Sequence, residues 1–310
     1  MNTVPFDKGE VEYLRGVAYS RRAGYFVLVS ILVLTGTGIA VAHLLAQPLD
    51  TLPVLAVALV ATSLGANTGL HMFFTHRTFR TGRVFRTVLA CLGTLLCQDG
   101  VVQWVANHKR HHRHVDVPGR DPHTPLEFGR STPAVMTLGL FWASAGWKFS
   151  RVRTSRAFYA RDLLQDPVAA WFDRHFVWLS LSGLALPFAT GWLVGGWRLG
   201  LEWFACYGAF RVFVGFFFTE FVVNGLCHAW GSRKFDIRGN SRNIVWMAPL
   251  TFGATLHHNH HAFPRVLSPA VDGEWDPMGP AGRLLQRLGV IELASGPSDI
   301  EVQARRRAET

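Results

Sequence analysis

The chain has 310 residues, of which 49% are hydrophobic and only 17% are charged, and its formal net charge is +10. Soluble globular chains carry about 25% charged residues, so this composition argues against a water-soluble single domain. The four cysteines form no C-x-x-C pair, and neither a disulfide scaffold nor a cysteine zinc site is indicated.

Long uncharged runs predict membrane-spanning helices. The first run, residues 24–46, can cross a hydrocarbon core of about 30 Å at 1.5 Å per residue. It is too long for the apolar region of a cleaved signal peptide, and a second run follows within a few residues. The four predicted spans are 24–46, 51–75, 176–197 and 203–228. Shorter runs at 87–98 and 133–147 predict interfacial or core helices on one side of the membrane.

The distribution of charge predicts the orientation of these spans. Of the 31 Lys and Arg residues, 29 lie in the segments 1–23, 76–175 and 229–310. The positive-inside rule places these segments in the cytoplasm. We therefore predict an all-α integral membrane protein, one domain over 1–310, with four transmembrane helices and a cytosolic helical cap formed by 76–175 and 229–310. The basic charge is then a topology signal that also suits anionic lipid, and it needs no nucleic acid partner.

Histidines gather in four groups at the cytosolic ends of the spans or in the cap. Residues at i, i+3 and i+4 share one face of a helix, so each H-x-x-H-H group can present three imidazoles together. The five-residue spacing of the first group fits a helix end, where the second histidine comes from the following turn. The groups are His71 with His76; His108, His111 and His112; Asn224 with His228; and His257, His260 and His261.

Nine clustered histidines without thiolates indicate a histidine-rich two-metal site. They exceed the four ligands of one tetrahedral zinc, and imidazole alone leaves zinc, copper, iron and nickel open. The isolated His43, His114, His175 and His258 are interpreted as capping or solvated residues. The alternatives of another class are a metal transporter, whose ligands would lie at mid-membrane, and a haem protein, which needs only two axial histidines.

At these residues the sequence resembles the membrane-bound fatty acyl desaturases, and among them the Δ9 acyl-CoA (stearoyl-CoA) desaturases. The resemblance extends from about residue 65 to 265 and adds several motifs to the histidine groups. They are Arg77 after the first group, Trp104 to His112, Asp121-Pro122-His123, Asp162 to Pro167, Asn240 to Asn243, and Leu250 to Gly253 before His257, with Phe263-Pro264 after His261.

The resemblance implies a non-haem di-iron centre with O2 as co-substrate and no catalytic residue beyond the metal ligands. By analogy, one iron would use His71, His76, His108, His112 and His261. The other would use His111, His228, His257 and His260, with Asn224 acting through water. The implied reaction introduces a double bond, cis and at a Δ9-like position, into an acyl-CoA or acyl-lipid.

Other residues are candidates for the surroundings of the metals and of the substrate. Glu220 lies on one stripe with Asn224 and His228 and is expected to hydrogen-bond a ligand or another polar group. The candidates for binding the substrate head group are Arg151, Arg153, Arg156 and Arg161, for which a solvated face is the alternative.

The sequence also departs from the family pattern near the metals. Met72 stands where relatives have Arg, and Ala254, Thr255 and Leu256 replace an acid, a glycine and an aromatic residue. Hydroxylation, acetylenic bond formation or decarboxylation by the same metals are therefore alternatives. The chain carries no haem or dinucleotide motif, so we expect electrons from a separate ferredoxin or cytochrome with its reductase, and an acidic donor would suit the basic cytosolic face.

Overall fold

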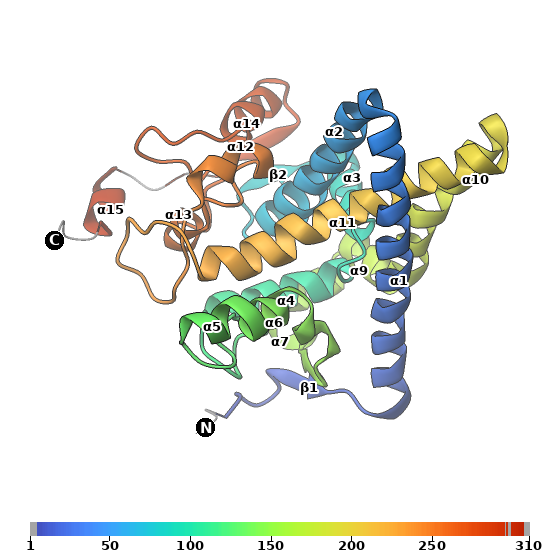
Figure 1. Ribbon diagram of the computed structural model, residues 1–310. Helices are drawn as coiled ribbons and strands as arrows, with labels where there is room; N and C mark the ends of the chain where they lie inside the picture. Colours follow the sequence, from blue (N-terminus) through green and yellow to red (C-terminus); the bar gives the residue numbers. More distant parts are fainter. Residues whose placement is uncertain (1–4, 295, 297–298, 307–310) are drawn as a thin grey trace.

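The computed structural model describes residues 5–294, 296 and 299–306, and most of them are helical (Figure 1). Among the described residues, three helices are long and apolar enough to cross a membrane: Gly16–Ala46, Pro48–Thr75 and Phe176–His228. The first is α1. The second joins a short turn, α2 (Thr51–Thr62) and the π-helical segment η2 (Ser63–Thr75). Apolar runs without charged residues thus form helices where the sequence predicts them.

The described part of the chain has three such helices and not the four predicted, because the last two predicted spans lie within one helical segment of 53 residues. In chain order, this segment consists of α10 (Phe176–Trp203), the π-helical η5 (Phe204–Phe210), α11 (Arg211–Phe216), the π-helical η6 (Phe217–Gly225) and η7 (Leu226–His228). Non-helical dihedral angles interrupt it at Gly195 and at Gly196, whose φ is 82°.

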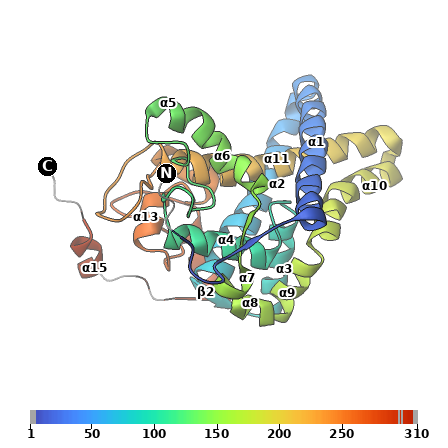
Figure 2. The same cartoon turned by 90° about the horizontal axis from the view of Figure 1, so that it is seen from below.

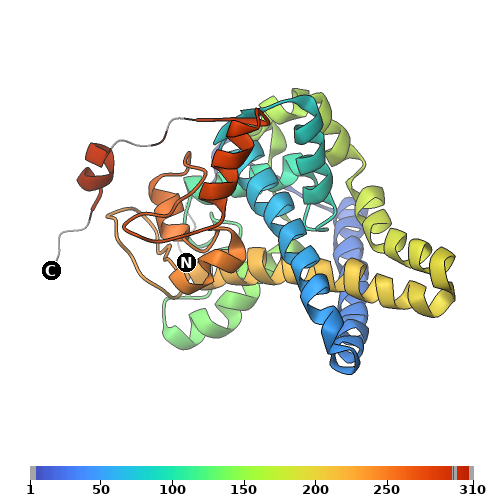
Figure 3. The same ribbon diagram turned by 90° about the horizontal axis from the view of Figure 1, so that it is seen from above.

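The chain reverses direction at these two glycines. A Cβ atom on Gly191 would lie 2.7 Å from the carbonyl oxygen of Leu199, and one on Gly200 would lie 2.9 Å from that of Phe188. Residues on the two sides of the turn therefore pack backbone to backbone, and Figure 3 shows the two arms as a hairpin that projects away from the remaining helices. The close approach at Gly191 and Gly200 leaves no room for a side chain, and the positive φ of Gly196 favours glycine there.

The remaining helices form a cap at the other end of the long helices, on the side where α4 and α13 lie (Figure 2). The runs predicted at 87–98 and 133–147 correspond to α3 (Arg83–Thr94) and to α5 (Thr132–Ala134), η3 (Val135–Gly139) and α6 (Leu140–Ser144). The other helices of the cap are α4 (Val101–Arg113), η4 (Gly146–Phe149), α7 (Arg156–Tyr159), α8 (Arg161–Gln165), α9 (Pro167–Arg174), η8 (Val245–Met247), α12 (Ala248–Thr251), α13 (His257–Ala262), α14 (Met278–Arg287) and α15 (Asp299–Ala304).

Four short strands in the described part of the chain depart from the all-α prediction. Strand β1 (Val11–Tyr13) pairs antiparallel with β3 (Val152–Thr154), and β2 (Phe79–Thr81) pairs antiparallel with β4 (Ile291–Leu293). Each pair joins a segment near a chain end to the cap. The largest apolar core lies beside β2 and β4, where η2, α3, α4 and α9 meet around Leu70, Leu89 and Val105.

Candidate metal centre

Four elements bring the nine clustered histidines together. The π-helical segment η2 carries His71 and ends just before His76; α4 carries His108, His111 and His112; η7 carries His228; and α13 carries His257, His260 and His261. The backbone N–H of His76 donates to the carbonyl oxygen of His71 at 3.1 Å. This five-residue hydrogen bond is typical of a π-helix, and it explains how histidines five apart reach the same site.

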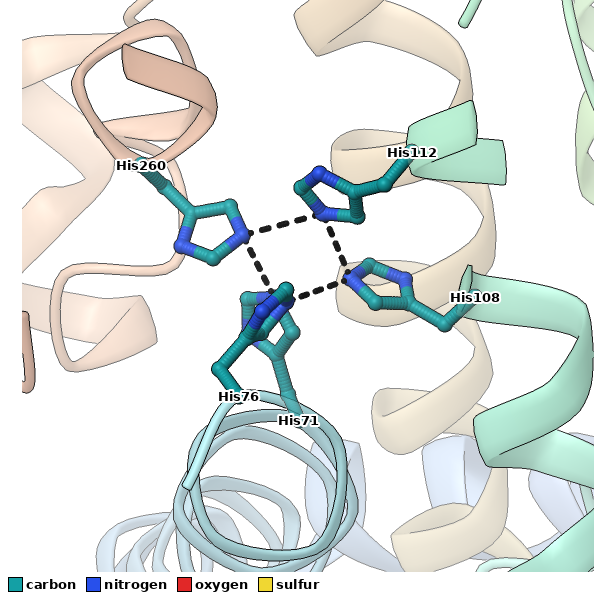
Figure 4. A group of neighbouring side chains, drawn as sticks. All are labelled: His71, His76, His108, His112 and His260. Carbon is teal, nitrogen blue, oxygen red and sulfur yellow. Dashed lines mark hydrogen bonds between the residues drawn. The ribbon is translucent and has the colours of Figure 1, made fainter. Parts of the chain in front are cut away.

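Five histidines form the first cluster, in which one nitrogen of each lies within 4.8 Å of the others (Figure 4). The Nε2 atoms of His71 and His260 are 3.0 Å apart, and those of His76 and His108 are 3.1 Å apart. His112 Nε2 lies 3.0 Å from His108 Nε2 and 3.2 Å from His260 Nε2. The rings therefore point their Nε2 atoms toward one common point.

Four histidines form the second cluster: His111, His228, His257 and His261. The Nε2 atom of His257 lies 2.9 Å from that of His228 and 3.0 Å from that of His261. His111 Nε2 completes the group, 3.3 Å from His261 Nε2. The rings of His112 and His261, which belong to different clusters, stack at 4.4 Å, so the two clusters are neighbours.

The structure exchanges His260 and His261 relative to the assignment that the resemblance implied. His260 lies in the first cluster and His261 in the second. Helix geometry gives the reason: residues four apart share a stripe, whereas the residue three positions along lies to one side of it. His108 and His112 therefore stay together while His111 faces the other cluster, and on α13 His257 and His261 stay together while His260 crosses over.

Hydrogen bonds at Nδ1 fix the tautomer of three histidine rings. Asp121 accepts from His111 Nδ1 at 2.8 Å, Asp116 accepts from His228 Nδ1 at 2.9 Å, and Asn67 Oδ1 lies 3.2 Å from His71 Nδ1. A neutral imidazole that holds its proton on Nδ1 leaves a bare lone pair on Nε2. Two such lone pairs facing one another at about 3 Å repel unless a proton or a metal ion lies between them, so the donor set fits metal ions.

Burial and charge also prepare these groups for a metal. Burial, with further repulsion from neighbouring histidines, holds the pKa values of His76, His108, His112 and His260 well below the usual histidine value. The rings of the first cluster outside the membrane helices are therefore neutral, as metal ligands must be.

For the carboxylates that accept hydrogen bonds from the rings, burial and the histidine partners shift the pKa in opposite directions. Burial opposes ionisation of Asp121, but the charge of His111 and its hydrogen bond outweigh this and hold the pKa of Asp121 below its usual range. The same balance, with His228 as the partner, lowers the pKa of Asp116. For His111, burial is outweighed by Asp121, and its pKa is raised. Asp116 and Asn67 had no recognisable motif in the sequence, because only the fold brings them to the histidines.

A cavity leads away from the first cluster. Its inner part is lined by His71 and His108 together with Trp104, Gln98, Glu220 and Asn224. Its outer part is lined by Leu59, Phe218 and Leu250 together with hydroxyl-bearing residues such as Thr62, Ser63 and Thr251. Both parts share Ala66, Asn67, Thr219, Val223 and Ala254, so they adjoin. Leu250 is 46% exposed, which places the outer end at the molecular surface.

Asn224, Glu220 and Ala254 lie at the cavity, whereas Met72 does not. Asn224 lines the cavity beside His71 and donates to Glu220 Oε2 at 2.9 Å. Glu220 therefore contacts a predicted ligand, and it also pairs with Lys148. Of the residues that depart from the family pattern, Met72 is fully buried in the apolar core, whereas Ala254 lines the cavity.

The predicted head-group arginines do not form one site. Arg151 lies over the ring of Tyr19, Arg153 donates to Gln103 at 2.6 Å, and Arg156 pairs with Asp173 at 2.6 Å. Arg161, at the start of α8, is exposed. None of the four lines the cavity at the histidines.

The isolated histidines mostly behave as expected. His175 ends α9, His43 pairs with Asp50, and His114 pairs with Glu10. His258 differs, because it is completely buried and its Nε2 accepts from the backbone N–H of Phe235 at 3.0 Å. Its role is to hold the backbone that follows η7 against α13.

Comparisons with known proteins agree with this geometry. The sequence model of the fatty acid desaturase family matches residues 46–270. A hex-5-enoyl acyl-carrier-protein acetylenase of Moorena producens is 31% identical over 304 residues, which cover 96% of this chain and 92% of that protein. An sn-1 stearoyl-lipid 9-desaturase of Anabaena variabilis is 30% identical over 76% of this chain and 79% of its own length. The Delta-9 desaturase-like 4 protein of Arabidopsis thaliana is 30% identical over 80% and 77%.

Proposed function

This chain belongs to the fatty acid desaturase family and is an oxidoreductase, and from that premise we propose that it introduces a cis double bond into a fatty acyl chain at two metal ions held by the nine clustered histidines. The convergence of their Nε2 atoms, with Nδ1 of His111 and His228 bonded to carboxylates, is the observation that carries the proposal. The Δ9-like position follows from the desaturase relatives.

We propose iron as the metal at both clusters. A non-haem di-iron centre supplies an oxidant, made from O2, that can remove hydrogen from an unactivated methylene, which no side chain can do. The first cluster would hold one ion through His71, His76, His108, His112 and His260. The second would hold the other through His111, His228, His257 and His261. Asn224, which lines the cavity beside His71 and His108, is a candidate ligand through water.

The chain's own residues would bind and orient the substrate. The apolar outer cavity beside Leu59, Phe218 and Leu250 suits methylene groups and excludes water from the reacting carbons. His71 and His108 border the inner cavity, so an acyl chain that lies there passes next to the first cluster. Asp116 and Asp121 would hold His228 and His111 in the tautomer that binds metal.

The membrane arrangement completes the proposal. Each arm of the Phe176–His228 hairpin would cross the bilayer once, and the cap with both clusters would face the cytoplasm. Electrons would come from a separate donor protein such as a ferredoxin or a cytochrome, for which the basic cap offers a complementary surface.

A second candidate is the formation of a triple bond on an acyl chain carried by a carrier protein. The Moorena producens acetylenase supports it, because the similarity covers 96% of this chain, against 76% for the Anabaena variabilis desaturase. Hydroxylation or decarboxylation would also use such a metal centre, but none of these relatives is named for those reactions.

Metal and product analyses test the proposal. Detergent-purified protein should contain about two irons per chain, and His111→Ala and His261→Ala should each lower that content. Membranes that contain the protein and a reductase system should convert saturated acyl lipid or acyl thioester into a product two hydrogen atoms lighter, as measured by mass spectrometry. An alkenyl substrate converted to an alkyne would favour the second candidate. Near-zero metal in folded protein, or a product with added oxygen, would contradict the desaturase proposal.

A further inference from the structure

Three of the nine clustered histidines are partly exposed, whereas the others are buried. The three are His76, His112 and His261. They lie at the ends of three elements: His76 follows η2, His112 is the next-to-last residue of α4, and His261 is the next-to-last residue of α13. The two clusters therefore come closest to solvent where these three ends meet.

Basic residues surround the exposed edge of the first cluster. Arg77 follows His76 directly in the chain, and both Arg77 and Lys109 pair with Asp162. Burial and a neighbouring histidine lower the pKa of His76 first, and the charges of Lys109 and Arg265 lower it further. Both cations therefore lie near the ring of His76.

A surface hollow with a volume of about 940 Å³ adjoins these residues. Phe73, Phe74 and Leu163 form an apolar floor in it. Its charged lining residues are Arg77, Arg80, Arg86, Arg265, Asp162, Asp166 and Glu292. Arg80 and Arg265 are exposed and have no ion-pair partner in the described part of the chain. The four arginines together with Lys109 are called the basic face, in which they outnumber the three acidic residues.

The proposed reaction needs electrons from outside the chain. Formation of one double bond with O2 removes two hydrogen atoms from the acyl chain, takes up two electrons and two protons, and yields two molecules of water. A one-electron donor must therefore dock and leave twice in each turnover. Short-lived complexes of electron-transfer proteins have small interfaces, and complementary charge speeds their formation. Charged side chains around an apolar centre, beside a metal cluster, suit such an interface.

We propose that the basic face is the docking surface of an acidic one-electron donor protein, whose electrons enter the first cluster at the partly exposed edge of His76. The inference rests on the proposed function and adds the place where the partner binds. The acyl cavity lies elsewhere, because none of the residues that line it lines the hollow. The donor and the acyl chain can therefore be bound at the same time.

The decisive variant reverses the two charges that have no ion-pair partner. Arg80→Glu with Arg265→Glu breaks no ion pair of the described chain, so the iron content should equal that of the wild type. Electron transfer from reduced plant-type ferredoxin, an acidic iron–sulfur protein, to the iron-loaded protein is followed by stopped-flow absorbance. Its rate constant at low salt should fall at least about tenfold. At about 0.5 M salt the difference should shrink to about threefold or less, because screening removes the attraction.

The matched control is Lys8→Glu with Arg130→Glu, which changes the net charge equally at exposed positions beside β1 and α5. Figure 1 shows β1 and α5 well below β2, which carries Arg80. The control should keep the wild-type rate constant within about twofold. Photoreduced deazariboflavin, a small neutral reductant, should reduce the iron of all three proteins equally. An equal loss in the control, or no loss in the decisive variant, overturns the inference.

If the decisive variant does not fold, Arg80→Gln with Arg265→Gln takes its place and should lower the rate constant about threefold. An acidic acyl-carrier protein is the competing occupant of the basic face. Wild-type ferredoxin kinetics in a variant that loses activity only with a hexadecanoyl carrier protein would assign the face to that carrier and overturn the inference.

A binding measurement separates this inference from the proposed function. If photoreduced wild type converts no acyl substrate, the proposed function fails, and docking is tested by calorimetric titration of metal-free protein with oxidised ferredoxin at low salt. The decisive variant should bind ferredoxin about tenfold more weakly than the wild type. Equal affinity of the two proteins overturns the docking surface, as does iron that deazariboflavin reduces and ferredoxin does not.

Discussion

At the residue scale, two carboxylates orient histidines of the second cluster. Asp116 and Asp121 each accept the Nδ1 proton of one histidine and thereby aim its Nε2 atom at the cluster. Loss of such a partner typically lowers metal affinity about 10- to 100-fold. We expect Asp116→Asn and Asp121→Asn to lose about one of two bound metals during dialysis, as measured by elemental analysis. Asp272→Asn, at a surface ion pair, is the control, and full retention of both metals would contradict the role assigned to the two carboxylates.

The pH dependence of metal loading follows from the same burial. The pKa values of His76, His108, His112 and His260 are held well below the usual histidine value by burial first and by neighbouring histidines second. Protons compete with a metal only below the pKa of the ligand. The apparent affinity of the first cluster should therefore stay constant as the pH falls through about 6.5, and decline only at lower pH.

Metal titrations between pH 5 and 8 would check this expectation, with a His111→Ala variant used to follow the first cluster alone. His111 has a raised pKa because Asp121 outweighs its burial, so binding at the second cluster should release a proton at pH values where binding at the first cluster releases none. A first-cluster affinity that falls tenfold per pH unit from about 6.5 downward would contradict the protected environment.

At the scale of elements, the π-helical segment η2 must approach α3 closely to present its histidines. A Cβ atom on Gly65 would lie 2.7 Å from the backbone of Leu92, which cannot move aside as a side chain could. Overpacking of this kind typically costs about 1–3 kcal/mol. Gly65→Val should therefore lower the thermal midpoint in detergent and reduce bound metal by displacing His71. Gly38→Ala on α1 meets nothing within 4 Å and should leave both unchanged.

The sequence predicts an element well when the interactions that form it join residues close together in the chain, and poorly when they join distant ones. Apolar runs and helical histidine spacing are local signals, and α1, α4 and α13 follow from them. The partners of β1 and β2 lie far away in the chain, at β3 and β4, and no local pattern in three residues specifies them. The same reason hides Asp116 and Lys148, because their roles depend on contacts made only in the folded chain.

The exchange of His260 and His261 is a different case. The i, i+4 rule was available in the sequence, and applied strictly it pairs His257 with His261. The assignment by resemblance placed these two at different metals, and the structure follows the helix geometry. Local geometry was here the better guide to which imidazoles share a cluster.

At the scale of the whole molecule, the hairpin at Gly195 and Gly196 decides how the chain sits in the membrane. The arm from Phe176 to the turn has 19 residues before Gly195 and rises about 1.5 Å per residue, which gives about 29 Å, close to the thickness of a hydrocarbon core. Two complete crossings would place this turn on the same side as Leu49, between α1 and α2, and opposite the cap. A hairpin that enters the membrane from the cytoplasmic side and leaves on that same side would not expose the turn on the side of Leu49.

Cysteine labelling distinguishes these arrangements. In a chain whose four native cysteines are replaced by alanine, we expect Val194→Cys and Leu49→Cys to react with a membrane-impermeant maleimide added to intact cells. Arg130→Cys, in the exposed segment before α5, should react only after permeabilisation. Metal content equal to that of the wild type shows that each variant is folded. If Val194→Cys is protected until permeabilisation while Leu49→Cys is not, the two arms do not cross the membrane; the cap and its clusters then keep the cytoplasmic side that the positive-inside rule predicts, and the proposal of one crossing per arm is overturned.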